Sequence, residues 1–185
     1  MTKLRLETLF EHPGAKDLGL PELYHSLPHD LPFEKKIATL TKEIIAYYPL
    51  LKEKETAEII HNFDTYYTNN IQHLMHHARV QFLIRVGEGC HILDTSEELR
   101  QKTYTWIEKH QKDTTLNLYF SLVPLLLPEL RALKRIRVIN LGGSPILFLP
   151  HFLTTLPKLK TVILSPDHKL RDPHTFLARQ TVNHH

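Results

Sequence analysis

The feature that most constrains the fold of this chain is an internal repeat of 23 residues in its C-terminal third. Four apolar positions of one segment return 23 residues later: Leu133, Ile136, Ile139 and Leu141, then Leu156, Leu159, Val162 and Leu164. One copy earlier only Leu116 and Leu118 match, because Asp113 stands where an apolar residue is expected. Terminal copies of a repeat are commonly degenerate in this way. The period therefore predicts stacked units that share one apolar core.

The second and third units read L-x-x-L-x-x-L-x-L, and all three units place a polar residue three positions after the last apolar residue, namely Ser121, Ser144 and Asp167. Over about residues 113–178 the chain resembles the leucine-rich-repeat family, whose unit is L-x-x-L-x-L-x-x-N-x-L. The three polar residues replace the family's asparagine, and all three can bond to main chain where the chain leaves its strand. The resemblance implies a short solenoid whose parallel strands form a concave sheet.

The Leu149-Pro150 and Leu156-Pro157 pairs resemble the "LP" elements of short bacterial leucine-rich repeats. Some of these repeats follow a helical N-terminal cap in secreted virulence proteins that modify host signalling. This second resemblance implies a bacterial effector, a protein that could be exported into a host cell without a cleavable signal.

The rest of the chain predicts an α/β protein with a helical domain before the solenoid. Residues 1–32 are rich in Pro, Gly and His and indicate an irregular N-terminal arm. Residues 33–110 carry apolar residues at helical spacing and predict a helical domain or cap, in which Thr95 and Glu98 form a capping box. The leucine-rich repeats follow over 111–178, and 179–185 form a tail.

The predicted sheet has one outward face, and any binding function is expected there because a solenoid buries the other face. Equivalent side chains on neighbouring strands line up about 4.8 Å apart. One expected row is Asn117, Asn140 and Ile163, and another is Thr115, Val138 and Thr161. The remaining candidates for the binding face are Tyr119, Arg137 and Lys160. These residues lack a nucleophile with a base and lack paired carboxylates, so they favour recognition of another protein over catalysis.

Charge suggests an alternative function. Residues 131–185 hold nine Lys or Arg against two Asp, within a chain of net charge +3. Lys158 and Lys160 lie 23 residues after Arg135 and Arg137, so these four residues predict a basic stripe across neighbouring strands. Such a stripe, within residues 131–160, could bind nucleic acid or an acidic partner.

Histidines suggest a second alternative, a metal-dependent enzyme. His73, His76 and His77 fall at helical spacing, and imidazoles four residues apart can reach one metal ion. The chain has 14 histidines, so such spacings arise by chance, and no Cys or acidic ligand lies close by in the same helix. We therefore expect no metal, no cofactor and no enzymatic activity.

Composition limits the compartment. Cys90 is the single cysteine, so an intramolecular disulfide and a cysteine-rich zinc site are excluded. The first residues lack the apolar run of a signal peptide, and no stretch reaches the roughly 18 apolar residues that predict a membrane span. The expectation is a cytoplasmic protein without membrane insertion.

Overall fold

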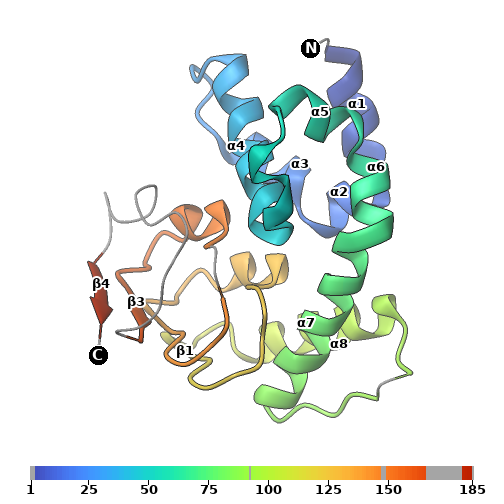
Figure 1. Ribbon diagram of the computed structural model, residues 1–185. Helices are drawn as coiled ribbons and strands as arrows, with labels where there is room; N and C mark the ends of the chain where they lie inside the picture. Colours follow the sequence, from blue (N-terminus) through green and yellow to red (C-terminus); the bar gives the residue numbers. More distant parts are fainter. Residues whose placement is uncertain (1–2, 92, 147–148, 166–180, 185) are drawn as a thin grey trace.

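The protein is helix-rich and carries a small parallel sheet (Figure 1). The structure, a computed structural model, describes residues 3–91, 93–146, 149–165 and 181–184. Helices α1 to α6 gather at one end of the molecule, α7 runs from them toward α8, and the sheet lies beside this helical part. The combination of helices and parallel strands confirms the coarse α/β prediction. The sheet is open, with β1 and β4 as its edges.

The N-terminal segment is helical, so the expectation of an irregular arm over residues 1–32 is wrong. It holds α1 (Lys3–Glu11), α2 (Pro13–Asp17) and α3 (Leu20–Ser26). Pro13 and Pro21 stand in the first turns of α2 and α3, where proline is well tolerated because the first N–H groups have no helical partner. Between these helices Gly19 adopts a φ of 62°, which favours glycine. The prolines and glycines therefore separate short helices here, where the sequence pattern predicted irregular chain.

The predicted helical region over 33–110 is confirmed as helical. Its elements are α4 (Phe33–Tyr47), η1 (Pro49–Glu53), α5 (Thr56–His61), α6 (Phe63–Tyr66), η2 (Tyr67–Ile71), α7 (Gln72–Arg85) and α8 (Ser96–Lys109). In α4, Ile37, Leu40 and Ile44 are buried on one face, which explains their helical spacing. The capping box at the start of α8 is confirmed: Thr95 Oγ1 accepts from the Glu98 N–H at 3.2 Å, and the Thr95 N–H donates to Glu98 Oε2 at 2.6 Å.

Between α6 and α7 the helix continues through Asn69 and Asn70. Element η2 is a π-helical turn, which accommodates an extra residue in a helix without ending it. Phe63 before the turn and Ile71 at its end are both buried in the core. The wide turn thus keeps both apolar side chains inward.

Strands β1 (Thr115–Asn117), β2 (Val138–Asn140) and β3 (Thr161–Leu164) form the parallel sheet in the register that the 23-residue period predicts. Asn117 pairs with Asn140, which pairs with Ile163. The apolar positions of the repeat are buried beneath them, together with residues of the 3-10 helices η3 (Pro128–Ala132) and η4 (His151–Thr155). The first and second copies therefore each consist of a short strand, a turn and a 3-10 helix.

The polar residues after the strands are buried and bonded. Ser144 Oγ donates to the main-chain oxygen of Leu118 at 2.6 Å, as expected for a residue that satisfies main chain at the turn. Ser121 Oγ lies 3.0 Å from Ser144 Oγ, one repeat away. The corresponding Asp167 lies outside the described residues, as does most of the third copy after Ser165.

The predicted tail over 179–185 contains a strand. Element β4 (Thr181–His184) pairs with β3 in parallel, and Thr161 is the partner of Thr181. These partners are 20 residues apart, three fewer than the period of the preceding copies. The 23-residue period therefore does not predict this strand.

Candidate functional site

The sheet exposes one face, and the predicted rows lie on it. The outward residues of β1, Thr115 and Asn117, are exposed, while those of β2 and β3 are partly buried between their neighbours. The register places Thr115, Val138 and Thr161 in one row and Asn117, Asn140 and Ile163 in the next. Sequence reasoning thus identified which residues the fold brings together on this face.

The two asparagines in the second row are fixed by main chain. Asn117 Oδ1 accepts from the Tyr119 N–H, and Asn140 Oδ1 accepts from the Gly142 N–H, both at 3.1 Å. These bonds are the local turns for which asparagine is suited. Within the described chain neither Nδ2 group donates to another protein group, so both remain free to donate to a ligand.

An apolar patch lies where the chain leaves β1. Tyr119, Phe120 and Leu122 are exposed by 47%, 70% and 71% respectively, and the rings of Tyr119 and Phe120 meet edge to face at a centroid distance of 4.5 Å. A Cβ atom at Gly142 would lie 2.8 Å from the Tyr119 ring, and one at Gly143 would lie 2.8 Å from the Phe120 ring. The two glycines therefore make the surface on which these rings rest. We call Tyr119, Phe120 and Leu122 the apolar patch.

Phe120 also adopts a rare backbone conformation. Its φ is 51°, in the left-handed region that side chains other than glycine and asparagine rarely occupy. The Phe120 N–H donates to the Gly142 oxygen at 2.7 Å, which ties this residue to the next copy. No sequence signal predicts this conformation, because phenylalanine normally indicates a strand or a core position.

The four residues of the predicted basic stripe lie near the opposite end of the strands. Arg135, Arg137, Lys158 and Lys160 are all exposed, and among the described residues none of them is in an ion pair. The Lys160 N–H donates to the Arg137 oxygen at 2.9 Å, so these two residues lie on adjacent chain segments. We call these four residues the basic row.

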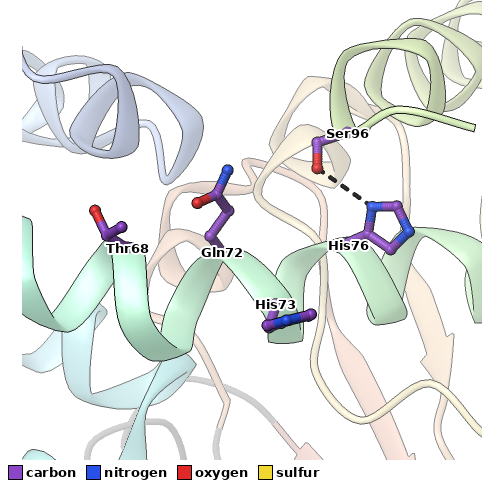
Figure 2. A pocket seen from close by; sticks show the side chains of 5 residues that line it. All are labelled: Thr68, Gln72, His73, His76 and Ser96. Atoms are coloured by element: carbon purple, nitrogen blue, oxygen red, sulfur yellow. Dashed lines mark hydrogen bonds between the residues drawn. The ribbon is translucent and has the colours of Figure 1, made fainter.

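A separate pocket of about 330 Å³ lies on the helical part (Figure 2). Its lining comes from the π-helical turn, α7 and the start of α8: Thr68, Gln72, His73, His76 and Ser96. His76 Nδ1 lies 3.2 Å from Ser96 Oγ, and His73 lines the same pocket about one turn earlier on α7 (Figure 2). His77 is exposed and is not part of this lining.

Among the described residues, these histidines are not gathered with other potential metal ligands. In the part of the chain that the structure describes, no group of three or more His, Cys, Asp or Glu side chains could hold a metal ion. His73, His76 and His77 have the spacing of ligands on one helix, but no other element brings a further ligand to them. The geometry therefore gives no support to the metal-dependent alternative.

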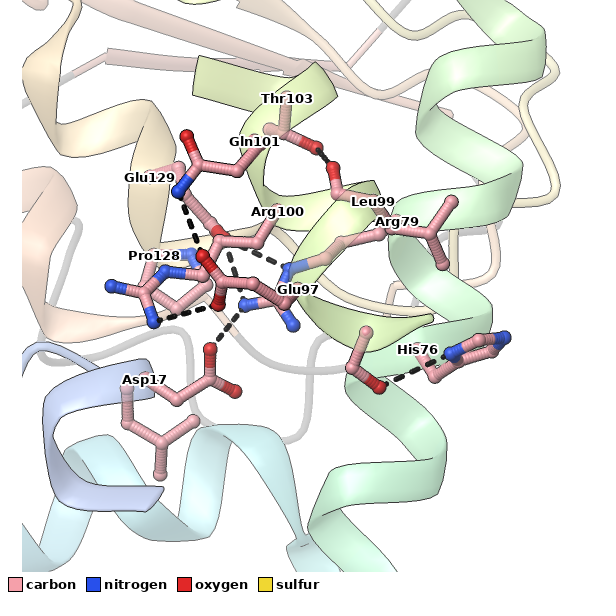
Figure 3. A network of polar contacts seen from close by, with 12 residues as sticks. Asp17, His76, Arg79, Glu97, Leu99, Arg100, Gln101, Thr103, Pro128 and Glu129 are labelled. Atoms are coloured by element: carbon pink, nitrogen blue, oxygen red, sulfur yellow. Dashed lines mark hydrogen bonds and ion pairs between the residues drawn. The ribbon is translucent and has the colours of Figure 1, made fainter. Parts of the chain in front are cut away.

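A buried ionic cluster joins three elements (Figure 3). The Arg79 guanidinium of α7 donates to Glu129 Oε1 of η3 at 2.8 Å through Nε, and Nη2 pairs with Asp17 Oδ1 of α2. Tyr67 donates its hydroxyl proton to Asp17 Oδ2 at 2.9 Å. Burial raises the pKa of Glu129. Burial also acts to lower the pKa of Arg79, but the nearby carboxylates of Glu129 and Asp17 have the larger combined effect and raise it. The cluster connects the helical part to the sheet, and no pocket reaches it among those described.

A second polar contact crosses the same junction. The carboxylate of Glu43, fully buried on α4, accepts from the main-chain N–H of His151 and from the hydroxyl of Tyr47. Arg131 of η3 donates to the main-chain oxygens of Leu18 and Gly19. Sequence reasoning missed both contacts, because the partners are more than 100 residues apart and follow no spacing rule.

No helix within the described residues combines the length and the apolar character needed to cross a membrane. Comparison with protein-family models, with curated proteins and with solved structures found no match to this chain. The candidate site therefore stands on its own geometry, which consists of an exposed strand face with an apolar patch at one end and a basic row at the other.

Proposed function

We propose that this chain is a non-catalytic protein–protein interaction module that binds a partner through the exposed face of its sheet. The proposal includes a leucine-rich-repeat type of solenoid for residues 111–178, behind a helical cap. The face is formed by Thr115, Asn117, Tyr119, Arg137, Val138, Asn140, Lys160, Thr161 and Ile163.

The observation that carries this proposal is the alignment of side chains from three strands into continuous rows on the outward face of the sheet, where those of β1 are exposed and those of β2 and β3 are partly exposed. Two of these side chains, Asn117 and Asn140, have their oxygens fixed by main chain and keep donors available. Beside them lie exposed aromatic rings, and aromatic side chains often supply the main anchors of protein interfaces. Rows of small and polar residues next to such anchors suit recognition of a surface.

The test is an affinity capture that compares the wild-type chain with a face variant carrying Asn117→Arg, Asn140→Glu and Ile163→Arg. A matched control variant carries Lys42→Gln, Thr65→Arg and Glu108→Gln, which make the same net charge change at exposed positions of the helical part. Circular dichroism first establishes that both variants fold like the wild type.

We expect specific partners to be captured by the wild type and by the control variant and to be lost with the face variant. If the same partners remain bound to the face variant, the sheet face is not the binding surface and the proposal is wrong. If the control variant alone loses them, the binding surface lies on the helical part.

A further inference from the structure

We propose that the exposed face binds an extended peptide segment of a partner protein, with an apolar side chain of that segment on the apolar patch and its carboxylates on the basic row. This inference rests on the proposed function, since it names the chemistry of the partner that the same face would recognise.

Two of the three side chains in the apolar patch make contacts within the chain although they are exposed. Tyr119 and Phe120 pack edge to face, rest on Gly142 and Gly143, and belong to a turn held by main-chain bonds. A rigid aromatic pair loses little conformational freedom on binding, which favours affinity. Because Phe120 is 70% exposed, its ring gains little from burial in the chain itself. A residue kept in an unfavourable backbone conformation without such a gain indicates a binding role.

The basic row lacks partners inside the described chain and so favours an acidic ligand. All four cations are exposed, and the corresponding stretch of the first copy holds Lys112 beside Asp113, whose charges cancel. The positive charge is therefore concentrated on the segments before β2 and β3. Charge complementarity of this kind fixes the orientation of a ligand and speeds its association.

The spacing between the two ends fits a short extended segment. Arg137 belongs to the basic row, and the Tyr119 ring of the apolar patch rests on Gly142. From Arg137 to Gly142 the chain advances five residues, which spans roughly 17 Å in a strand. About five extended residues of a bound peptide cover that distance. Between the ends lie small side chains and the two Asn Nδ2 donors, which could reach main-chain oxygens of the peptide.

The same arrangement is less suited to nucleic acid. Proteins that bind single strands interleave cations with aromatic rings, because phosphates and bases alternate along the strand. Here the cations and the rings lie at opposite ends of the strands, and the basic row extends over two strands only. The observations therefore favour a peptide whose acidic and apolar residues are separated along its length.

The experiment is a selection from a library of random decapeptides displayed on phage, carried out with three forms of the full chain. The forms are the wild type, a patch variant with Phe120→Asn and Leu122→Ser, and a charge-reversed variant with Arg135→Glu, Arg137→Glu, Lys158→Glu and Lys160→Glu. Each is tested for folding by circular dichroism and thermal unfolding. If the charge-reversed variant does not fold, a variant with Arg135→Gln and Lys158→Gln replaces it. We expect this variant to lose the preference for peptides that contain acidic residues.

We expect the wild type to enrich peptides that carry Asp or Glu separated by about four to six residues from Leu, Phe, Tyr or Trp. The charge-reversed variant should enrich Lys or Arg at the acidic positions and keep the apolar preference. The patch variant should keep the acidic preference and lose the apolar one. The affinity of the best wild-type peptide, measured by fluorescence anisotropy, should fall about tenfold or more in each variant.

Three outcomes would overturn the inference. The first is that the wild type enriches no peptides, and the second is that the enriched peptides lack acidic residues. The third is that both variants select the same peptides as the wild type. A short fluorescent oligouridylate, titrated in parallel, tests the competing ligand. If it binds the wild type more tightly than any selected peptide and loses binding on charge reversal, the face is a nucleic-acid site.

Failure of this inference is distinguishable from failure of the proposed function. If the face variant with Asn117→Arg, Asn140→Glu and Ile163→Arg loses its captured partners while no acidic and apolar peptide is selected, the face binds protein by another chemistry. If the captured partners persist with that variant, the face itself is not used.

Discussion

Phe120 combines a left-handed backbone with a mostly exposed ring, and these two properties can be separated by substitution. Phe120→Ala and Phe120→Asn both remove the ring contacts with Tyr119 and Gly143. Asparagine tolerates the left-handed region better than alanine does. We therefore expect the Asn variant to exceed the Ala variant in free energy of unfolding by about 1 kcal/mol, measured by urea denaturation.

The control for this comparison is Leu122, which is exposed to a similar degree and does not have a positive φ. At this position, Leu122→Asn should be no more stable than Leu122→Ala. Equal stabilities of the two variants at position 120 would show that the left-handed conformation costs the chain little.

Glu43 makes stability depend on pH. Burial raises its pKa from 4.5 to about 7, against the opposing effects of Arg131, the His151 N–H and Tyr47. The folded chain holds this proton more tightly than the unfolded chain, so the stabilisation is complete below about pH 4.5 and is lost as the pH rises through about 7. Glu43→Gln resembles the protonated form. Its stability relative to the wild type should therefore rise by up to about 3 kcal/mol between about pH 5 and about pH 8.

Urea denaturation of both chains across this pH range measures the difference directly. Glu34→Gln, which replaces an exposed carboxylate on the same helix, is the matched control and should give a difference that does not follow the same curve. A flat difference for Glu43→Gln would contradict a raised pKa at this position.

At the scale of elements, the Arg79 cluster holds α2, α7 and η3 together. Arg79→Met leaves two buried carboxylates without their cation, so we expect a loss of about 3–5 kcal/mol in the free energy of unfolding. Lys54→Met, which breaks an exposed ion pair with Glu58, should have a much smaller effect, because solvent screens that pair. Addition of Glu129→Gln to Arg79→Met should recover part of the loss, because it removes one unpaired charge.

Chemical denaturation of the four chains tests this ordering. A small effect of Arg79→Met, similar to that of Lys54→Met, would mean that the cluster contributes little to the junction between helices and sheet.

The elements also show how far the sequence alone could reach. The register of β1, β2 and β3 was predictable, because the buried residues of a strand repeat locally and the 23-residue offset carries that pattern from copy to copy. The capping box before α8 was also predictable, because it is a local pattern in which Thr95 and Glu98 are three residues apart. The outward rows of the candidate site followed from the register.

What the sequence could not predict depends on distant partners or on backbone geometry. Arg79 meets Glu129 and Asp17 across 50 and 62 residues, and no spacing rule links such positions. The Phe120 ring lies against Gly143 of the next copy, and no local pattern predicts its left-handed backbone conformation. Strand β4 was missed because its copy is shorter by three residues.

For the whole molecule, the helical part and the sheet share one apolar core. Buried residues from Leu6 to Leu164 belong to a single contiguous cluster. Arg131 and Glu43 add polar bonds across the junction, and Arg131 also lies over the Phe152 ring. Such a shared core gives neither part a separate interior, so we expect the two parts to unfold together.

Hydrogen exchange at increasing urea tests this expectation. Peptides from α7 and from β2 should converge on one free energy of opening, which equals the global value. Arg131→Gln should lower that value equally in both sets of peptides, because the guanidinium bonds link the two parts. Arg85→Gln, at an exposed position of α7, should leave both sets near the wild-type value. Exchange of the sheet peptides through a separate opening of lower energy, with a weaker dependence on urea than global unfolding, would instead mean that the sheet unfolds while the helical part remains folded.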